Sequence, residues 1–203
     1  RFESRGLGDV YKRQEQAEGS NYEYFQFVNS SVLHRADIHG KLNGINSSCS
    51  LSGLTLSKDK QHSATYINTD HAKPQCTSSQ NFKSILNDMS SGVFNGRTVV
   101  QEDSQKTNSR QSNKNLLLSD KALMNSNPQL EIYADDVKCA HGSTTGALDK
   151  EALFYMQSRG INKEEASSLL IRGFASELIN EVQHEETKKY LLNKFDHWLR
   201  YYN

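Results

Sequence analysis

Residues 92–101 read GVFNGRTVVQ, and apolar and polar side chains alternate along this stretch. The same alternation recurs in YEYFQFV (22–28), RADIHGKL (35–42), CSLSGLTLS (49–57), SATYINT (63–69) and LEIYADDVKC (130–139). A period of two residues is typical of β-strands. Turn-forming residues punctuate the region at Asn43-Gly44, Asn68-Thr69-Asp70, Asn95-Gly96 and Ser126-Asn127-Pro128, where we expect turns. The pattern therefore predicts an all-β body from Tyr22 to about His141.

Two all-β architectures fit this pattern. One is a sandwich or closed barrel built of hairpins, and the other is a parallel β-helix of stacked coils. The chain has 203 residues, of which only 35% are hydrophobic, and its mean hydropathy is −0.75. A β-helix would suit so polar a chain, because each coil needs few inward apolar residues. Alternation and composition alone leave both architectures open.

The charge balance excludes several classes of protein. The 24 Lys and Arg residues match 24 Asp and Glu residues, so nothing in the net charge of +0 attracts nucleic acid. No run of about 18 apolar residues predicts a membrane span, and no secretory signal is visible. The three cysteines, at 49, 76 and 139, are scattered, which argues against a disulfide framework. We expect a cytoplasmic protein without nucleic-acid or membrane partners.

The period changes to that of helices after His141. Asp149 can cap a helix through EALFYMQSR (151–159) that ends at Gly160, and Asn162 can cap a second helix. A third helix is expected from about 185 to 200. The apolar face expected for the second helix consists of Ala166, Leu169, Leu170, Gly173, Phe174 and Leu178. The sequence thus predicts a small helical C-terminal domain beginning near Gly146.

Cys139 and His141 are the candidate reactive pair. They lie two residues apart, so on a strand both side chains point to one face. A thiolate and an imidazole could form half of a soft-metal site or a nucleophile–base pair. The plainer interpretation is a small buried cysteine beside a histidine in a turn. No phosphate-binding loop, catalytic serine elbow or zinc-protease motif occurs in the chain.

Several longer motifs carry a family resemblance. They are GVFNG (92–96), QKTN (105–108), QSNKNLLLS (111–119), PQLEIYADDVKCAHG (128–142) and LFYMQSRGI (153–161). Together they resemble the SufB/SufD core family of the SUF iron–sulfur cluster assembly system, and the ADDVKCxHG form is closer to the SufD members. The resemblance runs from about residue 22 to 195. It implies a right-handed parallel β-helix followed by a small C-terminal α-helical domain.

The resemblance also implies a domain organisation. Residues 1–14 do not resemble the family, so we expect an unassigned and extraneous leader there. Residues 15–146 would form an N-terminally truncated β-helix core, and residues 147–203 a helical domain for ATPase docking. The chain looks like the C-terminal half of full-length members.

The implied function is that of a scaffold and not of an enzyme. Such a subunit would pair with a SufB-like subunit and bind a SufC-like ATPase, while a transient cluster forms at the SufB–SufD interface and none is bound stably. The implied metal ligands are Cys139 and His141, shared with the partner chain. The implied partner-binding residues are Leu153, Phe154, Tyr155, Arg159, Leu170 and Phe174. The alternatives are a β-helix carbohydrate-active enzyme and a purely structural adaptor.

Overall fold

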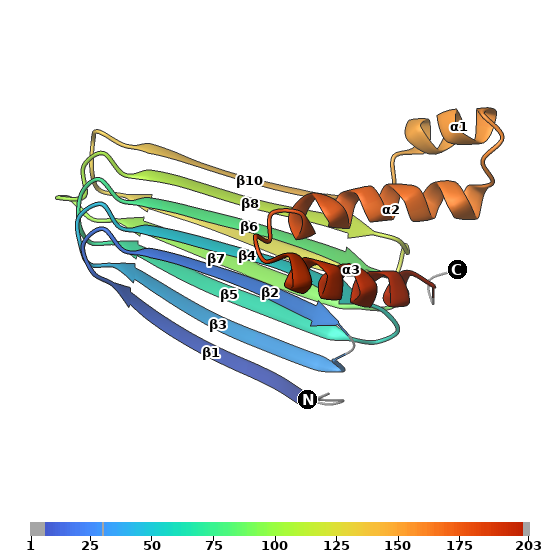
Figure 1. The fold of residues 1–203 in the computed structure, drawn as a ribbon, viewed down its shortest axis with the longest axis horizontal. Helices are drawn as coiled ribbons and strands as arrows, with labels where there is room; N and C mark the ends of the chain where they lie inside the picture. Colours follow the sequence, from blue (N-terminus) through green and yellow to red (C-terminus); the bar gives the residue numbers. More distant parts are fainter. Residues whose placement is uncertain (1–6, 30, 201–203) are drawn as a thin grey trace.

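A computed structural model describes residues 7–29 and 31–200 and shows ten strands followed by three helices (Figure 1). The strands are β1 (Leu7–Gln16), β2 (Asn21–Asn29), β3 (Leu33–Leu42), β4 (Ser48–Ser57), β5 (His62–His71), β6 (Thr77–Leu86), β7 (Ser91–Val100), β8 (Asn108–Leu117), β9 (Leu123–Ile132) and β10 (Lys138–Gly146). The helices are α1 (Lys150–Ser158), α2 (Lys163–Ile179) and α3 (Glu185–Arg200).

The strands form two parallel sheets that alternate along the chain. The odd-numbered strands pair in the order β1-β3-β5-β7-β9, and the even-numbered strands in the order β10-β8-β6-β4-β2. Each coil therefore contributes one strand to each sheet, and equivalent residues such as His34 and Ser63 stack 29 positions apart. The parallel β-helix is confirmed, because the hairpins of a sandwich or barrel would pair antiparallel.

The corners between strands use the left-handed backbone region repeatedly. Asn46, Gln75 and Lys106 have φ of 56°, 61° and 59° in successive corners that follow odd-numbered strands. Asp59 and Asp88 occupy two corners that follow even-numbered strands, with φ of 55° and 53°. Asn and Asp adopt this region more readily than most residues. One left-handed residue thus turns the chain at the same place in several coils.

Three of the four expected turns are wrong. Asn43-Gly44 does lie in a corner, but Asn68–Asp70, Asn95-Gly96 and Ser126–Pro128 lie inside β5, β7 and β9. Gly96 is required for another reason, since a Cβ there would collide with Gln111 Nε2. Pro128 is tolerated because β9 ends its sheet, and an edge strand has one side that needs no ladder hydrogen bonds.

The expectation of a leader over residues 1–14 also needs correction for residues 7–14. Leu7–Gln16 form β1, which pairs in parallel register with β3 over its whole length, from Leu7 with Leu33 to Gln16 with Leu42. The ladder is made by backbone groups, so it does not require the alternation of side chains that this stretch lacks. Residues 1–6 lie outside the described residues.

The interior of the β-helix combines a thin apolar core with buried polar side chains. The apolar cluster contains Ile38, Leu42, Cys49, Leu51, Ile67, Cys76, Phe82 and Phe94. Beside it, His71 is fully buried and its Nε2 lies 2.8 Å from Ser78 Oγ, which lies 2.9 Å from Ser109 Oγ. Burial lowers the pKa of His71 to about 4, so the ring is neutral. Side-chain hydrogen bonds between coils thus let a polar chain form a buried interior.

Helices α2 and α3 cover the outer face of the even-numbered sheet (Figure 1). The apolar cluster between them contains Leu54, Leu56, Ile85 and Leu116 from the sheet and Ile171, Ala175, Leu178, Ile179, Leu191, Phe195, Trp198 and Leu199 from the helices. The expected apolar face of α2 is therefore rotated. Leu169 and Gly173 are exposed, while Ile171 and Ala175 are buried against the sheet.

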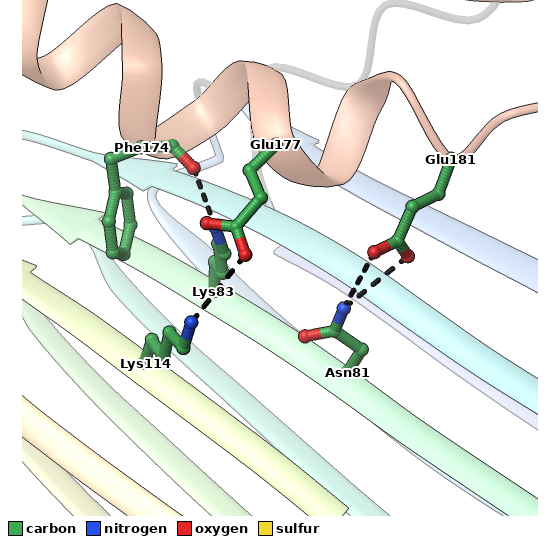
Figure 2. Close-up of polar contacts among 6 residues, drawn as sticks. All are labelled: Asn81, Lys83, Lys114, Phe174, Glu177 and Glu181. Carbon is green, nitrogen blue, oxygen red and sulfur yellow. Dashed lines mark hydrogen bonds and ion pairs between the residues drawn. The ribbon is translucent and has the colours of Figure 1, made fainter.

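One buried cation lies in this contact. The side chain of Lys83 is 1% exposed, and its Nζ donates to Phe174 O at 2.8 Å and Glu177 Oε2 at 2.6 Å (Figure 2). The ammonium also lies 4.6 Å from the centre of the Phe174 ring. Nearby, Asn81 Nδ2 donates to the Glu181 carboxylate at 3.1 Å. These bonds fix the position of α2 along the sheet.

Candidate functional site

The last coil leaves the inner row of β10 uncovered. Its register with β8 aligns Cys139 with Ser109 and His141 with Gln111. Ser109 and Gln111 are 1% and 3% exposed, because a further coil lies beyond them. No described strand follows β10 in its sheet, so Cys139 is half-buried and His141 is exposed. Cys139 and His141 thus lie on one inner row at the open end, as their spacing predicted.

Polar residues from both sheets meet at this open end. Ser126 Oγ of β9 lies 2.7 Å from Ser143 Oγ of β10 and donates to Asn113 Oδ1 at 2.7 Å. No described strand covers this end of the β-helix, which is lined by hydroxyl, amide, thiol and imidazole groups. Ser126 and Ser143 could not be identified as site residues from the sequence, because serines fill many outward positions as well.

Cys139 differs from the other two cysteines in its surroundings. Cys49 is buried in the apolar core, and burial raises its pKa to about 12. Cys76 is fully buried, and its Sγ donates to Gly44 O at 3.2 Å. Partial burial also raises the pKa of Cys139, and a hydrogen bond with the Ser109 backbone opposes this rise. Cys139 is therefore the cysteine that an incoming group can reach most directly.

The described residues do not by themselves form a complete metal site. They contain no group of three or more His, Cys, Asp or Glu side chains that could hold a metal ion. Cys139 and His141 would supply two ligands, whereas structural and catalytic zinc sites use three or four protein ligands. A metal at this end would therefore need ligands from outside the described chain.

The open end also presents two strand edges. β9 ends the odd-numbered sheet and β10 ends the even-numbered sheet. Within the described residues, no strand pairs with the outer edge of either one. Such edges are templates on which another chain can add strands. The candidate ligands thus lie between two edges that are competent for pairing.

The predicted partner-binding residues fall in two different environments. α1 extends away from the strands (Figure 1), and none of its residues, all of them described, is buried. Phe154 and Tyr155 are 73% and 60% exposed, and Leu153 is half-buried. Arg159 is exposed and its guanidinium lies 5.2 Å from the Tyr155 ring centre. Phe154, Tyr155 and Arg159 are therefore the exposed members of this set.

The other two predicted residues lie on α2. Leu170 and Phe174 are half-buried. Phe174 packs against the cluster between the helices and the sheet, and its carbonyl accepts the hydrogen bond from Lys83. Much of the Phe174 surface therefore already packs within the chain and is not free to contact a partner. The helix caps are as expected, since Asp149 Oδ1 accepts from Glu151 N and Asn162 Oδ1 accepts from Glu165 N.

A membrane span is not found in the part of the chain that the structure describes. None of its helices combines the length and the apolar character that crossing a bilayer requires.

Comparison with known proteins agrees with the resemblance in the motifs. The family described as "SUF system FeS cluster assembly, SufBD core domain" matches residues 9–174. The chain is 38% identical over 166 residues to iron–sulfur cluster assembly protein SufD of Escherichia coli, which covers 82% of this chain and 39% of that protein. It is 34% identical over 174 residues to protein ABCI7, chloroplastic, of Arabidopsis thaliana, covering 83% of this chain and 36% of the relative.

The chain spans less than half the length of these curated relatives. The matched region contains all ten strands except the first residues of β1, together with α1 and much of α2. The open end with Cys139 and His141 lies within it. This chain belongs to the SufBD core family of the SUF system for iron–sulfur cluster assembly, with the SufD proteins among its relatives.

Proposed function

We propose that this chain is a cytoplasmic, non-enzymatic scaffold subunit, and that a nascent iron–sulfur cluster forms against its open end. The observation that carries the proposal is the position of Cys139 and His141 on the uncovered inner row of β10, between the free edges of β9 and β10. Thiolate sulfur and imidazole nitrogen are both ligands that iron accepts. The cluster is the product of assembly and not a resident group.

A SufB-like subunit would complete the site by pairing with these edges. Added strands would extend both sheets through backbone hydrogen bonds and bring further ligands over the open end. Because two ligands do not hold a cluster stably, it forms transiently and only in the assembled pair.

A SufC-like ATPase would dock on the helical domain. The exposed side chains of Phe154 and Tyr155, with Leu153 and Arg159, form the centre of the proposed surface. Exposed aromatic and arginine side chains are the types that dominate protein interfaces. Leu170 and Phe174 are half-buried, so each could contribute only part of its surface.

The test of the cluster site is His141→Ala in the complete complex. We expect this variant to lower cluster formation, measured as iron and sulfide bound by the complex, and to leave capture of the ATPase unchanged. Cys139→Ser should act in the same direction. The matched control is His39→Ala, because His39 points outward on the opposite sheet. Normal cluster formation by His141→Ala would refute the site and favour a purely structural adaptor.

The test of the docking surface is Phe154→Glu in a pull-down with the SufC-like ATPase. Phe154 is 73% exposed, so the charge should weaken capture without unfolding the chain. Tyr11→Glu is the control, because Tyr11 is 65% exposed on β1, at the opposite end of the odd-numbered sheet from β9. Undiminished capture by Phe154→Glu would remove α1 from the interface.

A further inference from the structure

His141 stands at the end of a column of amides inside the β-helix. Gln80 of β6 pairs in register with Gln111 of β8, and Gln111 pairs with His141 of β10. The two glutamines are 2% and 3% exposed. Equivalent positions in successive coils stack directly on one another, so the three side chains follow one line toward the open end.

The hydrogen bonds along this column have a direction. Gln80 Nε2 donates to Thr69 Oγ1 and Thr98 Oγ1, each at 3.0 Å. Gln111 Nε2 donates to Gln80 Oε1 at 2.7 Å. In a stacked ladder of amides, the N–H and C=O groups face opposite neighbours. Gln111 uses its N–H on the side of Gln80, which leaves Oε1 as the group available to the next coil, where His141 lies in register.

Gln111 Oε1 is the unsatisfied end of this column. It is buried, and it accepts no hydrogen bond from any described residue. A buried acceptor without a partner destabilises the folded chain. The rest of the amide is held in place, because Gly96 leaves the space that it fills and a Cβ at that position would collide with Nε2. An acceptor without a partner therefore lies in the coil next to His141, at the position in register with it.

We propose that Gln111 is a positioning residue for His141, whose ring, not hydrogen-bonded to Gln111 in this structure, turns inward and donates one N–H to Gln111 Oε1. A neutral imidazole has one N–H and one nitrogen with a free lone pair. Fixing the N–H inward leaves the lone pair of the other nitrogen for a metal at the open end. Metal-binding histidines commonly use their second nitrogen in this way. The inference rests on the proposed role of His141 as a ligand.

The hydrogen bond can be tested without any cluster by nitrogen NMR of the full chain labelled at histidine. In alkaline buffer, the two nitrogen shifts of His141 report which ring nitrogen carries the proton. We expect a single tautomer in the wild-type protein, with the signal assigned by its loss in His141→Ala. A mixture of tautomers in the wild type would overturn the proposal, whether or not any Gln111 variant folds.

Gln111→Met keeps nearly the same side-chain length and removes the acceptor. We expect it to convert His141 to a mixture of tautomers while the circular dichroism of the β-helix stays unchanged. Ser109→Ala is the matched control, because Ser109 lies on the same strand and face but beneath Cys139. A tautomer pattern that is identical in wild type and Gln111→Met would overturn the proposal.

The cluster assay separates this inference from the proposed function. Loss of a residue that orients a metal ligand commonly lowers metal affinity 10–100-fold, so Gln111→Met should reduce the iron bound by the complex about 10-fold. If His141→Ala assembles clusters normally, the proposed function fails even where the NMR shows the hydrogen bond. If His141 is required and Gln111→Met loads iron normally, the positioning role fails alone.

Discussion

The ion pair between Lys83 and Glu177 should respond unequally to removal of its two members. The side chain of Lys83 is 1% exposed, whereas that of Glu177 is 59% exposed. Glu177→Ala leaves an ammonium in the contact between α2 and the sheet. Lys83→Met leaves a carboxylate that water already reaches and puts an apolar side chain in the buried position. We therefore expect Glu177→Ala to be the more destabilising change.

The expected free energies follow from this difference in burial. Breaking a buried pair so that one charge stays unpaired costs roughly 3–5 kcal/mol. Lys83 keeps its bond to Phe174 O at 2.8 Å and its contact with the Phe174 ring, so we expect a value near the lower limit, about 3 kcal/mol. Lys83→Met removes charged hydrogen bonds, which is unfavourable, but it also avoids burying an ammonium, which is favourable. We therefore expect the free energy of unfolding to change by at most about 1 kcal/mol.

The assay is denaturant unfolding followed by the fluorescence of Trp198. This is the single tryptophan of the chain, it is 4% exposed, and it lies in the cluster between the helices and the sheet. The double variant Lys83→Met, Glu177→Ala should be more stable than Glu177→Ala alone, since it also removes the unpaired ammonium. Glu185→Ala is the control, because it removes an ion pair with Lys188 in which Glu185 is 69% exposed. The stability of this variant should stay close to wild type. A larger loss for Lys83→Met than for Glu177→Ala would refute this reasoning.

Three further predictions concern pH and packing. Burial lowers the pKa of His71 from 6.5 to about 4, so the unfolded chain binds a proton that the folded chain refuses. The free energy of unfolding is therefore highest above about pH 6.5 and falls by about 3 kcal/mol toward pH 4. Equilibrium unfolding of His71→Gln should lack this loss. A hydrogen bond from Lys83 holds the pKa of Glu177 below 4.5. The contribution of this pair to the free energy of unfolding is therefore present above pH 4.5 and should disappear at lower pH. Unfolding followed by Trp198 fluorescence should show this step in the wild type and not in Glu177→Gln. Gly96→Ala would place a methyl group against Gln111 Nε2 and 2.9 Å from Gln80 Oε1, so we expect a loss of roughly 1–3 kcal/mol in thermal unfolding; an unchanged melting temperature would contradict the tight fit.

Local chemistry made part of the structure predictable from the sequence. The spacing of Cys139 and His141 on a strand places both on one face, and the structure agrees. Asp149 and Asn162 cap their helices because the bonds they accept come from residues two or three positions later. Such features depend on residues close together in the chain, so a short stretch of sequence is enough to predict them.

Features set by distant neighbours could not be predicted in the same way. Leu169 and Ile171 are both suitable for a buried helix face, and only the position of α2 on the sheet decides that Ile171 is buried. Asn95-Gly96 has the sequence of a turn, but the buried amides of Gln80 and Gln111 require a glycine inside β7. The exposure of His141 likewise depends on β10 being the last described strand of its sheet.

The apolar cluster under α2 and α3 has a consequence for how the molecule unfolds. A stack of coils is a linear array in which each unit touches only its neighbours, and such arrays can lose their end units one at a time. Here the cluster joins the helices to Leu54 and Leu56 of β4, Ile85 of β6 and Leu116 of β8, with Phe25 and Phe27 of β2 packed against it. The two helices bridge four successive coils, so these coils should unfold together instead of one at a time from the end.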